Sequence, residues 1–386
     1  MAMQLRGRHY QTGRTVEVQI EGGTIRSVAP ADDESDAWLA PGLFDSQVNG
    51  FGGKDLNAAE TVPEDASAVM QLLWEAGVTR FCPTVTTHSF ERMSNSLRAI
   101  ARACEQDARL KHASATFHIE GPYISAEDGP RGAHPREHAR LPDWDEFRRF
   151  QDAAQGRIGY VTLAPELPGA AQFVEKAARE GIVVALGHHA GNTDQIRAAV
   201  EAGARHSTHL GNGAHAQLPR HPNYIWDQLA EDRLSAGIIA DGHHLPPAVV
   251  KSFVRAKGLE RTILVSDAIA AAGLPPGRYD GNKGQAIEIT ETGRIQLAGT
   301  PFLAGSGLRL HQGVGNAVRF AGIALAESVR LATENPARLF GISDRYGRLE
   351  PGSDADLLVF AWDEAQSEIT VRQTISAGEV VYQSAS

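Results

Sequence analysis

Residues 159–189 read GYVTLAPELPGAAQFVEKAAREGIVVALGHH and contain one complete strand–helix–strand unit. The apolar segment Gly159–Leu163 has the length of a strand, Ala170–Arg179 has a helical pattern, and Val183–Leu186 is again apolar. Strands that alternate with helices in this way are typical of βαβ units and of a parallel sheet. His188 and His189 follow the carboxyl end of the second strand, and imidazole side chains can bind a metal ion or transfer protons.

The same alternation extends through the middle of the chain, with further helical stretches at Ala66–Glu75 and Asp194–Ala202. The strand candidates are residues 43–45, 79–81, 116–119, 159–163, 183–186, 206–208, 236–239 and 262–265. Eight parallel strands alternating with helices predict a closed (β/α)8 TIM barrel, an α/β fold. The alternative is an open doubly wound sheet, which needs a G-x-G-x-x-G loop after its first strand. Gly50, Gly52 and Gly53 lack that spacing.

Both ends of the chain are rich in strand patterns. Val16, Val18 and Ile20 alternate with polar residues, and 24–28 continues as a second strand after a turn. Near the other end, 356–360, 370–375 and 380–382 are strand candidates. We therefore expect a small β-sandwich domain from 1–41 and 347–386, and a catalytic barrel from 42–346.

Composition excludes several classes of partner. The 386 residues carry a net charge of −10, and a nucleic-acid or anionic-membrane surface normally needs a basic excess. Cys82 and Cys104 are too few for a disulfide framework and match no zinc motif. No apolar run approaches the ~20 residues of a membrane span, and the first ten residues contain no secretory signal. We expect a cytoplasmic protein that binds a small molecule, and neither a membrane nor nucleic acid.

Polar side chains follow several of the predicted strands. In a TIM barrel the active site lies at the carboxyl ends of the strands, where Glu120, His188, His209 and Asp267 stand. One carboxylate and two imidazoles form a metal set with an open position for water, whose pKa a bound cation lowers towards ~7. Asp267 would then accept the proton of the water and deliver it to a leaving amine. The pattern predicts metal-dependent amide hydrolysis.

Any one of these side chains alone has a structural explanation, such as a capped loop or a packed imidazole. Their convergence on several strand ends favours a metal site. The remaining histidines are assigned structural or supporting roles, with His189 as an alternative to His188 as ligand. They are His189, His206, His215, His221 and His243.

Several motifs in this order resemble the N-acetylglucosamine-6-phosphate deacetylases of the amidohydrolase superfamily, over nearly the whole chain. They are FHIEGPY at 117–123, TLAPE at 162–166, GH at 187–188, THLGN at 208–212, IADGHH at 239–244, VSDA at 265–268, NPA at 335–337 and GRLEPGSDAD at 347–356. The resemblance implies that Glu120, His188 and His209 bind one divalent metal ion and that Asp267 is the catalytic acid and base. It also implies that His134 contacts the substrate beside the carbonyl, as a second catalytic residue.

The resemblance further implies an amino-sugar phosphate as substrate, hydrolysed at its N-acetyl amide to glucosamine 6-phosphate and acetate. Arg220 is expected to reach the site of a partner subunit, which implies a homodimer, and its guanidinium suits a phosphate group. Leu303 is expected on a further substrate-contact loop. The implied substrate-binding residues are Ala133, His134, Asn212, Gly213, Arg220, His244 and Leu303.

The residues at the end of the first predicted barrel strand indicate how many metal ions the site binds. Many amidohydrolases carry His-x-His there, whereas this chain has Gln47 and Asn49, whose neutral amides are poor metal ligands. We therefore expect one ion, zinc, with Fe²⁺, Co²⁺ and Ni²⁺ as alternatives.

The segments 125–140 and 214–226 depart from the family pattern, as do Gly211 and Gly213, and these residues belong to the part of the chain expected to bind the sugar and its phosphate. Another N-acylated sugar or an N-acyl amino acid therefore stays open as the substrate. A non-catalytic sugar-binding barrel would lack a ligand or the aspartate, and all four are present.

Overall fold

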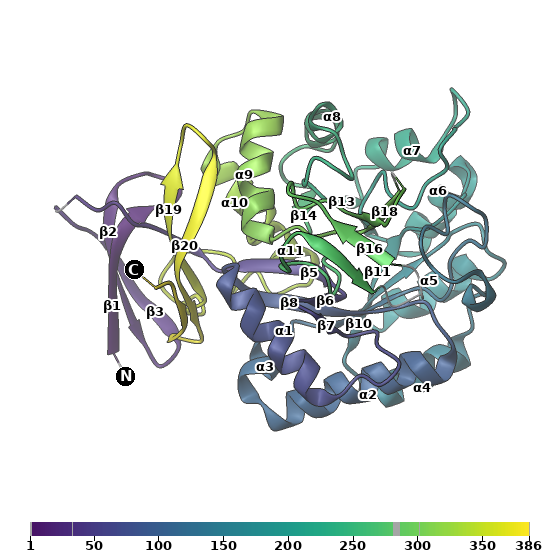
Figure 1. Ribbon diagram of the computed structural model, residues 1–386, viewed down its shortest axis with the longest axis horizontal. Coiled ribbons are helices and arrows are strands. Elements are labelled where there is room, and N and C mark those ends of the chain that lie inside the picture. Colours follow the sequence, from purple (N-terminus) through teal and green to yellow (C-terminus); the bar gives the residue numbers. More distant parts are fainter. Residues whose placement is uncertain (1, 33, 281–285, 301, 386) are drawn as a thin grey trace.

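The computed structural model describes residues 2–32, 34–280, 286–300 and 302–385. Its centre is an eight-stranded parallel sheet in the order β14-β13-β12-β11-β10-β9-β8-β5. A parallel bridge joins Val48, at the end of the first strand, to Ala268, just beyond the last strand, so the sheet closes into a barrel (Figure 1). The strands are β5 Leu43–Val48, β8 Val78–Thr86, β9 Phe117–Glu120, β10 Ile158–Leu163, β11 Val183–Leu186, β12 His206–Ser207, β13 Ser235–Ile238 and β14 Thr262–Leu264.

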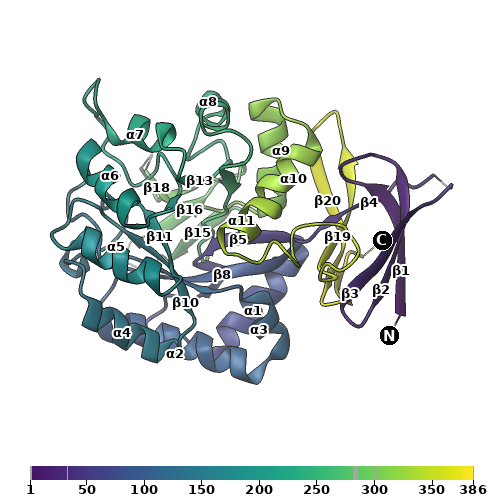
Figure 2. The same ribbon diagram turned by 180° about the vertical axis from the view of Figure 1, so that it is seen from behind.

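All eight predicted strands are present, which confirms the TIM barrel. Helices surround the strands on the outside, as the view from behind shows (Figure 2). They are α1 Pro63–Glu75, α2 Phe90–Gln106, α3 Ala108–Ala113, α4 Trp144–Ala153, α5 Ala170–Arg179, α6 Thr193–Ala202, α7 Tyr224–Ala230, α8 Pro247–Lys257, α9 Leu310–Ala321, α10 Leu325–Leu331 and α11 Glu334–Leu339, with a 3-10 turn at Arg136–His138. In the described part of the chain, none of these helices has the length and apolar character needed to cross a membrane.

The two ends of the chain form a separate seven-stranded sheet in the order β21-β20-β19-β4-β1-β2-β3, at one end of the molecule (Figure 1). The sheet folds over on itself, because Ile25 of β3 exchanges backbone hydrogen bonds with the segment before β19 through Gly352 and Ser353. The predicted sheet from both termini is confirmed, while its boundaries at 41 and 347 stay a prediction. The strands are β1 Ala2–His9, β2 Thr15–Glu21, β3 Thr24–Pro30, β4 Trp38–Pro41, β19 Leu357–Asp363, β20 Glu368–Ser376 and β21 Glu379–Gln383.

A four-stranded antiparallel sheet, which was not predicted from the sequence, follows the last barrel strand. Ile287 and Ile289 alternate with polar residues, and Gly293 marks the turn that follows, so a hairpin signal was present. Leu303 lies in a strand of this sheet, so the expected loop at that position is wrong. The strands are β15 Gly277–Asp280, β16 Ala286–Ile289, β17 Ile295–Leu297 and β18 Leu303–Gly305, and a two-stranded ribbon, β6 Gly50–Phe51 with β7 Lys54–Asp55, lies after β5.

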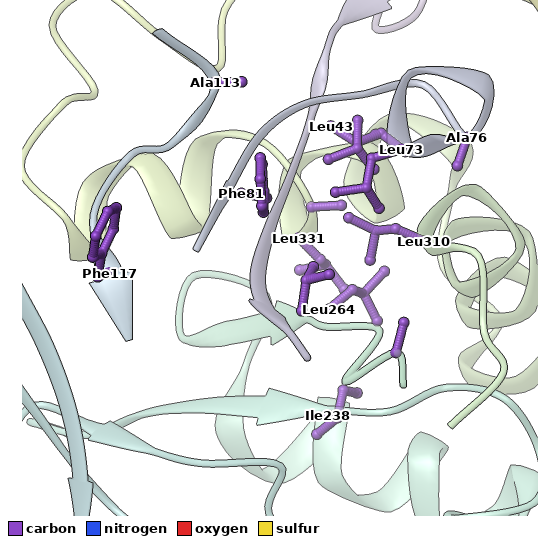
Figure 3. Close-up of a cluster of buried hydrophobic side chains, with 14 of the residues drawn as sticks. Leu43, Leu73, Ala76, Phe81, Ala113, Phe117, Ile238, Leu264, Leu310 and Leu331 are labelled. Carbon is purple, nitrogen blue, oxygen red and sulfur yellow. The ribbon is translucent and has the colours of Figure 1, made fainter. Parts of the chain in front are cut away.

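One apolar core joins the barrel strands to the helices around them. Leu43 of β5, Phe81 of β8 and Leu264 of β14 are buried and belong to the same cluster as Leu310 of α9 and Leu331 of α10 (Figure 3). Because close-packed interiors resist deformation, this core fixes the positions from which the strand ends project.

Ion pairs connect the barrel to the terminal sheet. Arg80 of β8 pairs with Asp354 and Asp356, each at 3.0 Å, and His112 of α3 contacts the Asp356 carboxylate at 3.0 Å. The terminal sheet is therefore attached to the barrel by a buried polar cluster as well as by apolar contacts.

Candidate active site

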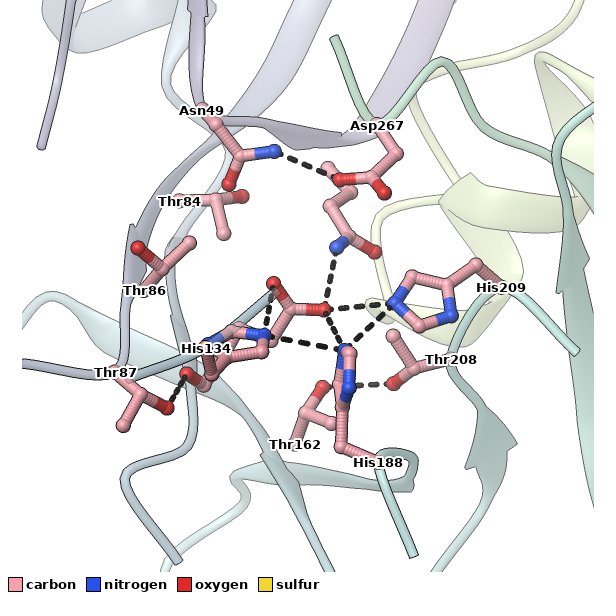
Figure 4. A network of polar contacts seen from close by, with 12 residues as sticks. Asn49, Thr84, Thr86, Thr87, His134, Thr162, His188, Thr208, His209 and Asp267 are labelled. Carbon is pink, nitrogen blue, oxygen red and sulfur yellow. Dashed lines mark hydrogen bonds and ion pairs between the residues drawn. The ribbon is translucent and has the colours of Figure 1, made fainter. Parts of the chain in front are cut away.

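Four of the predicted site residues meet at the carboxyl ends of the barrel strands (Figure 4). Glu120 is the last residue of β9, and His188 and His209 each come two residues after a strand, β11 and β12. Asp267 follows β14 and points into the same space (Figure 4). His134 reaches the group from the long segment between β9 and α4. The barrel thus brings together residues that are up to 147 positions apart, counting from Glu120 to Asp267.

Glu120, His188 and His209 form a small triangle of potential ligand atoms. Glu120 Oε1 lies 3.1 Å from His188 Nε2 and 2.9 Å from His209 Nε2, and the two nitrogens are 3.1 Å apart. Ligands at ~2.0–2.1 Å from one ion are separated by roughly 2.9–3.4 Å, depending on whether the geometry is octahedral or tetrahedral. The three atoms therefore have the spacing of ligands that share a single ion.

His134 is the fourth member of the cluster. Its Nε2 lies 3.2 Å from His188 Nε2 and 3.6 Å from Glu120 Oε2, and the ligand atoms of Glu120, His134 and His188 all lie within 4.8 Å of one another. The sequence resemblance placed His134 beside the substrate carbonyl. Its position is equally within reach of an ion, so the structure offers four donors where three were predicted.

The orientation of His188 fits a metal ligand. Its Nδ1 lies 3.0 Å from the carbonyl oxygen of Pro130, and because a carbonyl only accepts, Nδ1 carries the proton. With Nδ1 bonded to this carbonyl, Nε2 is the ring atom that faces Glu120 and His209. Unshared pairs at these separations repel one another unless a proton or a cation lies between them, so the donor set suits a divalent ion.

Burial and charge set the protonation of the cluster. Burial alone raises the pKa of Glu120, but its hydrogen bonds to His188 and His209 outweigh burial and lower that pKa well below the usual range. Burial lowers the pKa of His209, and the Glu120 carboxylate overcomes this and raises it to about 9. The negative charge of Glu120 is therefore held firmly in place, as binding of a cation requires.

Asp267 has the opposite shift. Burial, followed by the nearby charge of Glu120, raises the pKa of Asp267 to about 6. A carboxyl group with this pKa is mostly ionised at neutral pH and is still readily protonated, which suits a group that must both accept and donate a proton.

The backbone is strained at these positions. His188, His209 and Asp267 have φ values of +52°, +26° and +50°, and they are three of the six non-glycine residues with positive φ in the described part of the chain. Such conformations cost on the order of 1–3 kcal/mol and concentrate at functional sites. Three of the four residues predicted from the strand ends therefore have a strained backbone.

Comparison with known proteins decides the family. The model of the Amidohydrolase family matches residues 38–381. The chain belongs to the amidohydrolase family.

Its relatives are sugar-phosphate deacetylases. The chain is 35% identical to N-acetylglucosamine-6-phosphate deacetylase of Bos taurus over 92% of this chain and 86% of that protein. It is 32% identical to N-acetylgalactosamine-6-phosphate deacetylase of Escherichia coli O157:H7, over 89% of each. A solved variant of N-acetyl-D-glucosamine-6-phosphate deacetylase from Mycobacterium smegmatis, in complex with N-acetyl-D-glucosamine-6-phosphate, superimposes with a TM-score of 0.86 at 29% identity, covering 98% of this chain and 99% of that one. The predicted resemblance and the predicted amide hydrolase are confirmed.

The histidine next to the proposed ligand has a different environment in this amidohydrolase. His189 Nδ1 accepts a hydrogen bond from the Gly191 backbone over 3.1 Å, and its ring packs against Tyr224. Burial lowers the pKa of His189 to about 4, so it is neutral. The geometry therefore favours His188 over His189 as a member of the cluster.

The predicted substrate residues lie at different distances from the cluster. Gly213 adjoins it, since a Cβ added there would lie 2.7 Å from His188 Nδ1, and Asn212 donates to the His209 carbonyl over 3.3 Å. Ala133 is exposed beside His134. His244 Nδ1 lies 2.6 Å from Asp241 Oδ2, and a second bond joins its backbone to the same carboxylate.

Two predicted residues lie away from the ligand triangle. Arg220 is exposed on the 211–223 loop, and no contact found among the described residues joins its guanidinium to the cluster. Leu303 is half-buried on β18. Their substrate roles stay predictions.

A buried polar network lies beneath the cluster. His118 Nε2 lies 2.8 Å from Thr162 Oγ1, and His118 Nδ1 lies 3.2 Å from Thr84 Oγ1. Thr162 in turn contacts Thr208, at 2.7 Å, directly before His209. Burial lowers the pKa of His118 to about 3, so the network is neutral and supports the cluster without adding charge.

The hydrogen bonds made from the end of β5 were not predicted from the sequence. Gln47 and Asn49 were expected only to be poor metal ligands, whereas they donate to Glu120 and Asp267. The polar residues Asp45, Gln47 and Asn49 at the end of the first barrel strand were a usable signal, because the active site of a TIM barrel lies at the carboxyl ends of its strands.

Proposed function

We propose that this amidohydrolase removes the N-acetyl group of N-acetylglucosamine 6-phosphate and releases acetate and glucosamine 6-phosphate. The observation that carries the proposal is the convergence of Glu120, His188 and His209 within 3.1 Å of one another, beside Asp267. The sequence similarity to deacetylases of amino-sugar phosphates supports this class of substrate.

Glu120, His188 and His209 would hold one divalent ion, for which we propose zinc. Such an ion, when bound, acidifies water and polarises the amide carbonyl. Gln47 and Asn49 support a single ion, because their NH₂ groups already face carboxylates at 2.8 and 2.7 Å. An amide that presents its donor group in this direction does not serve as a ligand.

Asp267 would carry the proton through the reaction. Its carboxylate accepts a proton from the attacking water, whose oxygen forms the new bond to the acetyl carbon. The same proton then passes to the nitrogen as the C–N bond breaks, because an amine leaves poorly unless it is protonated. His134, 3.2 Å from His188, is placed to donate to the carbonyl oxygen as negative charge develops there.

The proposal also covers the residues that bind the substrate and the assembly of the protein. Asn212, Gly213, His244, Ala133 and Leu303 are proposed to bind the sugar and its phosphate. We further propose a cytoplasmic homodimer in which Arg220, exposed on its loop, reaches the site of the partner subunit.

Acetate release from three substrates, combined with elemental analysis, tests the proposal. N-acetylglucosamine 6-phosphate, its galactosamine epimer and unphosphorylated N-acetylglucosamine are compared at equal enzyme and zinc concentrations. The expected order places the gluco phosphate first, with about one zinc ion per chain. A preference for the galactosamine phosphate, which the similarity to the Escherichia coli relative makes the second candidate, would change the sugar and keep the reaction.

Asp267→Asn separates catalysis from binding. We expect kcat to fall by about 10²–10⁴-fold, the usual contribution of general acid–base catalysis, with unchanged zinc content. Wild-type kcat in this variant would remove Asp267 from the mechanism. Absence of acetate release by the wild-type protein from all three sugars would refute the proposed function.

A further inference from the structure

Two amide side chains at the end of β5 contact the two carboxylates of the site. Asp45 and Gln47 lie in β5, Asn49 is the residue directly after it, and all three are buried. Because alternate residues of a strand project to the same face, Asp45 and Gln47 lie on one side of β5.

Gln47 is bonded to the proposed ligand Glu120. Its side chain is 1% exposed, and Nε2 donates to Glu120 Oε1 over 2.8 Å. The accepting oxygen is the same one that lies 3.1 Å from His188 Nε2 and 2.9 Å from His209 Nε2. A donor on this oxygen fixes the rotation of the carboxylate, and with it the direction in which the remaining lone pair faces the histidines.

Asn49 makes the equivalent contact with Asp267, with Nδ2 donating to Oδ1 over 2.7 Å (Figure 4). A carboxylate only accepts hydrogen bonds, so the NH₂ of Asn49 is the group that must face it. No hydrogen bond to Asp267 Oδ2 is found among the residues that the structure describes. Asn49 thus occupies one oxygen and leaves the other for proton transfer.

Backbone contacts hold the same two segments together. Asp45 Oδ1 accepts from the Ser266 backbone at 3.1 Å, and the Asn49 backbone donates to the Ala268 carbonyl at 2.8 Å. These bonds flank Asp267, whose left-handed φ of +50° needs support from its neighbours. Asn49 and Asp267 are therefore held in register by contacts on both sides of the aspartate.

We propose that Gln47 and Asn49 are positioning residues that act on different parts of the site: Gln47 orients Glu120 for metal binding, and Asn49 orients Asp267 so that Oδ2 moves the proton. The inference rests on the proposed function. Its physical basis is that Glu120 and Asp267 repel each other across the site, and two neutral NH₂ donors stabilise both charges without a second cation.

Two matched variants at the end of β5 test the proposal, Gln47→Met and Asn49→Leu. Each removes one amide donor and keeps nearly the same volume. Zinc affinity is measured by competition with a chelator, and kcat and KM are measured at saturating zinc. Circular dichroism and Tm establish that each variant is folded.

The two variants are expected to fail in different ways. Gln47→Met should raise the zinc Kd by about 10–100-fold, the usual effect of losing a hydrogen bond to a ligand, with kcat recovering when zinc is in excess. Asn49→Leu should leave the zinc Kd within about threefold of wild type and lower kcat by about 10–100-fold, with little change in KM, since a charge-assisted bond is lost from Asp267 only. A purely structural role would not divide the two effects in this way.

The inference is overturned if Gln47→Met binds zinc as the wild type does. It is equally overturned if Asn49→Leu keeps wild-type kcat or regains it with excess zinc. If either variant does not fold, Gln47→Ala and Asn49→Ala are measured against the same expectations. A wild-type protein that releases no acetate refutes the proposed function instead, while the zinc titration of Gln47→Met still tests the inference.

Discussion

Asp356→Asn tests how the terminal sheet is attached to the barrel. The Asp356 side chain is fully buried and contacts Arg80 Nε at 3.0 Å, His112 Nε2 at 3.0 Å and the Ala377 backbone at 2.7 Å. Asparagine can keep the bond to Ala377 through its carbonyl oxygen. It loses the negative charge that faces the Arg80 guanidinium.

The size of the effect follows from these contacts. Breaking a buried ion pair costs about 3–5 kcal/mol, and Arg80 keeps its other partner, Asp354, at 3.0 Å, which places the loss at about 2–4 kcal/mol. The unfolding entropy is about 2.1 cal/mol/K per residue, so for 386 residues a loss of ~3 kcal/mol lowers Tm by about 4 °C.

The loss should depend on pH with a defined sign. Burial alone raises the pKa of Asp356, but the hydrogen bond to His112 and the charge of Arg80 lower it below its usual value. A depressed pKa contributes stability that is fully present above the unfolded-state value of about 3.9 and is lost as pH falls through the folded-state value. The difference in Tm between wild type and variant should therefore be constant from about pH 5 to pH 8, where the carboxyl group is ionised in both the folded and the unfolded state. It should shrink below about pH 4, where the carboxyl group becomes protonated.

Thermal unfolding of zinc-saturated protein across this pH range is the assay. Asp36→Asn is the matched control, because Asp36 also pairs with an arginine, Arg372 at 2.7 Å, but its side chain is 82% exposed. Exposed pairs contribute little, so this variant should unfold at the wild-type temperature. The expected decrease in Tm for Asp356→Asn at pH 7 is about 4 °C, so a decrease of less than 1 °C would refute the reasoning. A decrease in Tm that stays the same in acid would also refute it.

Three further outcomes are expected. Leu264→Ala removes a core side chain that is 1% exposed, and it should lower the free energy of unfolding by about 2–5 kcal/mol, measured by denaturant unfolding. A loss below ~1 kcal/mol would contradict the close packing of β14. Removing the metal with a chelator should lower Tm, and adding zinc should restore it. If zinc had been present at 100 times its Kd, the lost stability corresponds to about 2.7 kcal/mol. An unchanged Tm would argue against a bound ion. Arg220→Ala should raise KM for the phosphorylated sugar and leave that for N-acetylglucosamine unchanged, and an equal effect on both would exclude a phosphate contact.

The sequence by itself determined the barrel and the residue types of the site. The strands at 159–163 and 183–186 were recognisable because apolar runs of strand length alternate with helical segments, and this signal is local. Glu120, His188, His209 and Asp267 stand at strand ends, and parallel strands of a barrel have all their carboxyl ends on one side. That much of the site follows from order along the chain.

Only the tertiary structure decided which atoms face one another. The bond from Gln47 to Glu120 spans 73 residues, and the bond from Asn49 to Asp267 spans 218, so no local pattern could reveal either. His134 enters the cluster on a loop whose path depends on packing, and the sheet from β15 to β18 is added after the barrel closes. The physical reason is that hydrogen bonds and metal ligation depend on differences of a few tenths of an ångström, and those distances are set by barrel closure and core packing rather than by the order of residues.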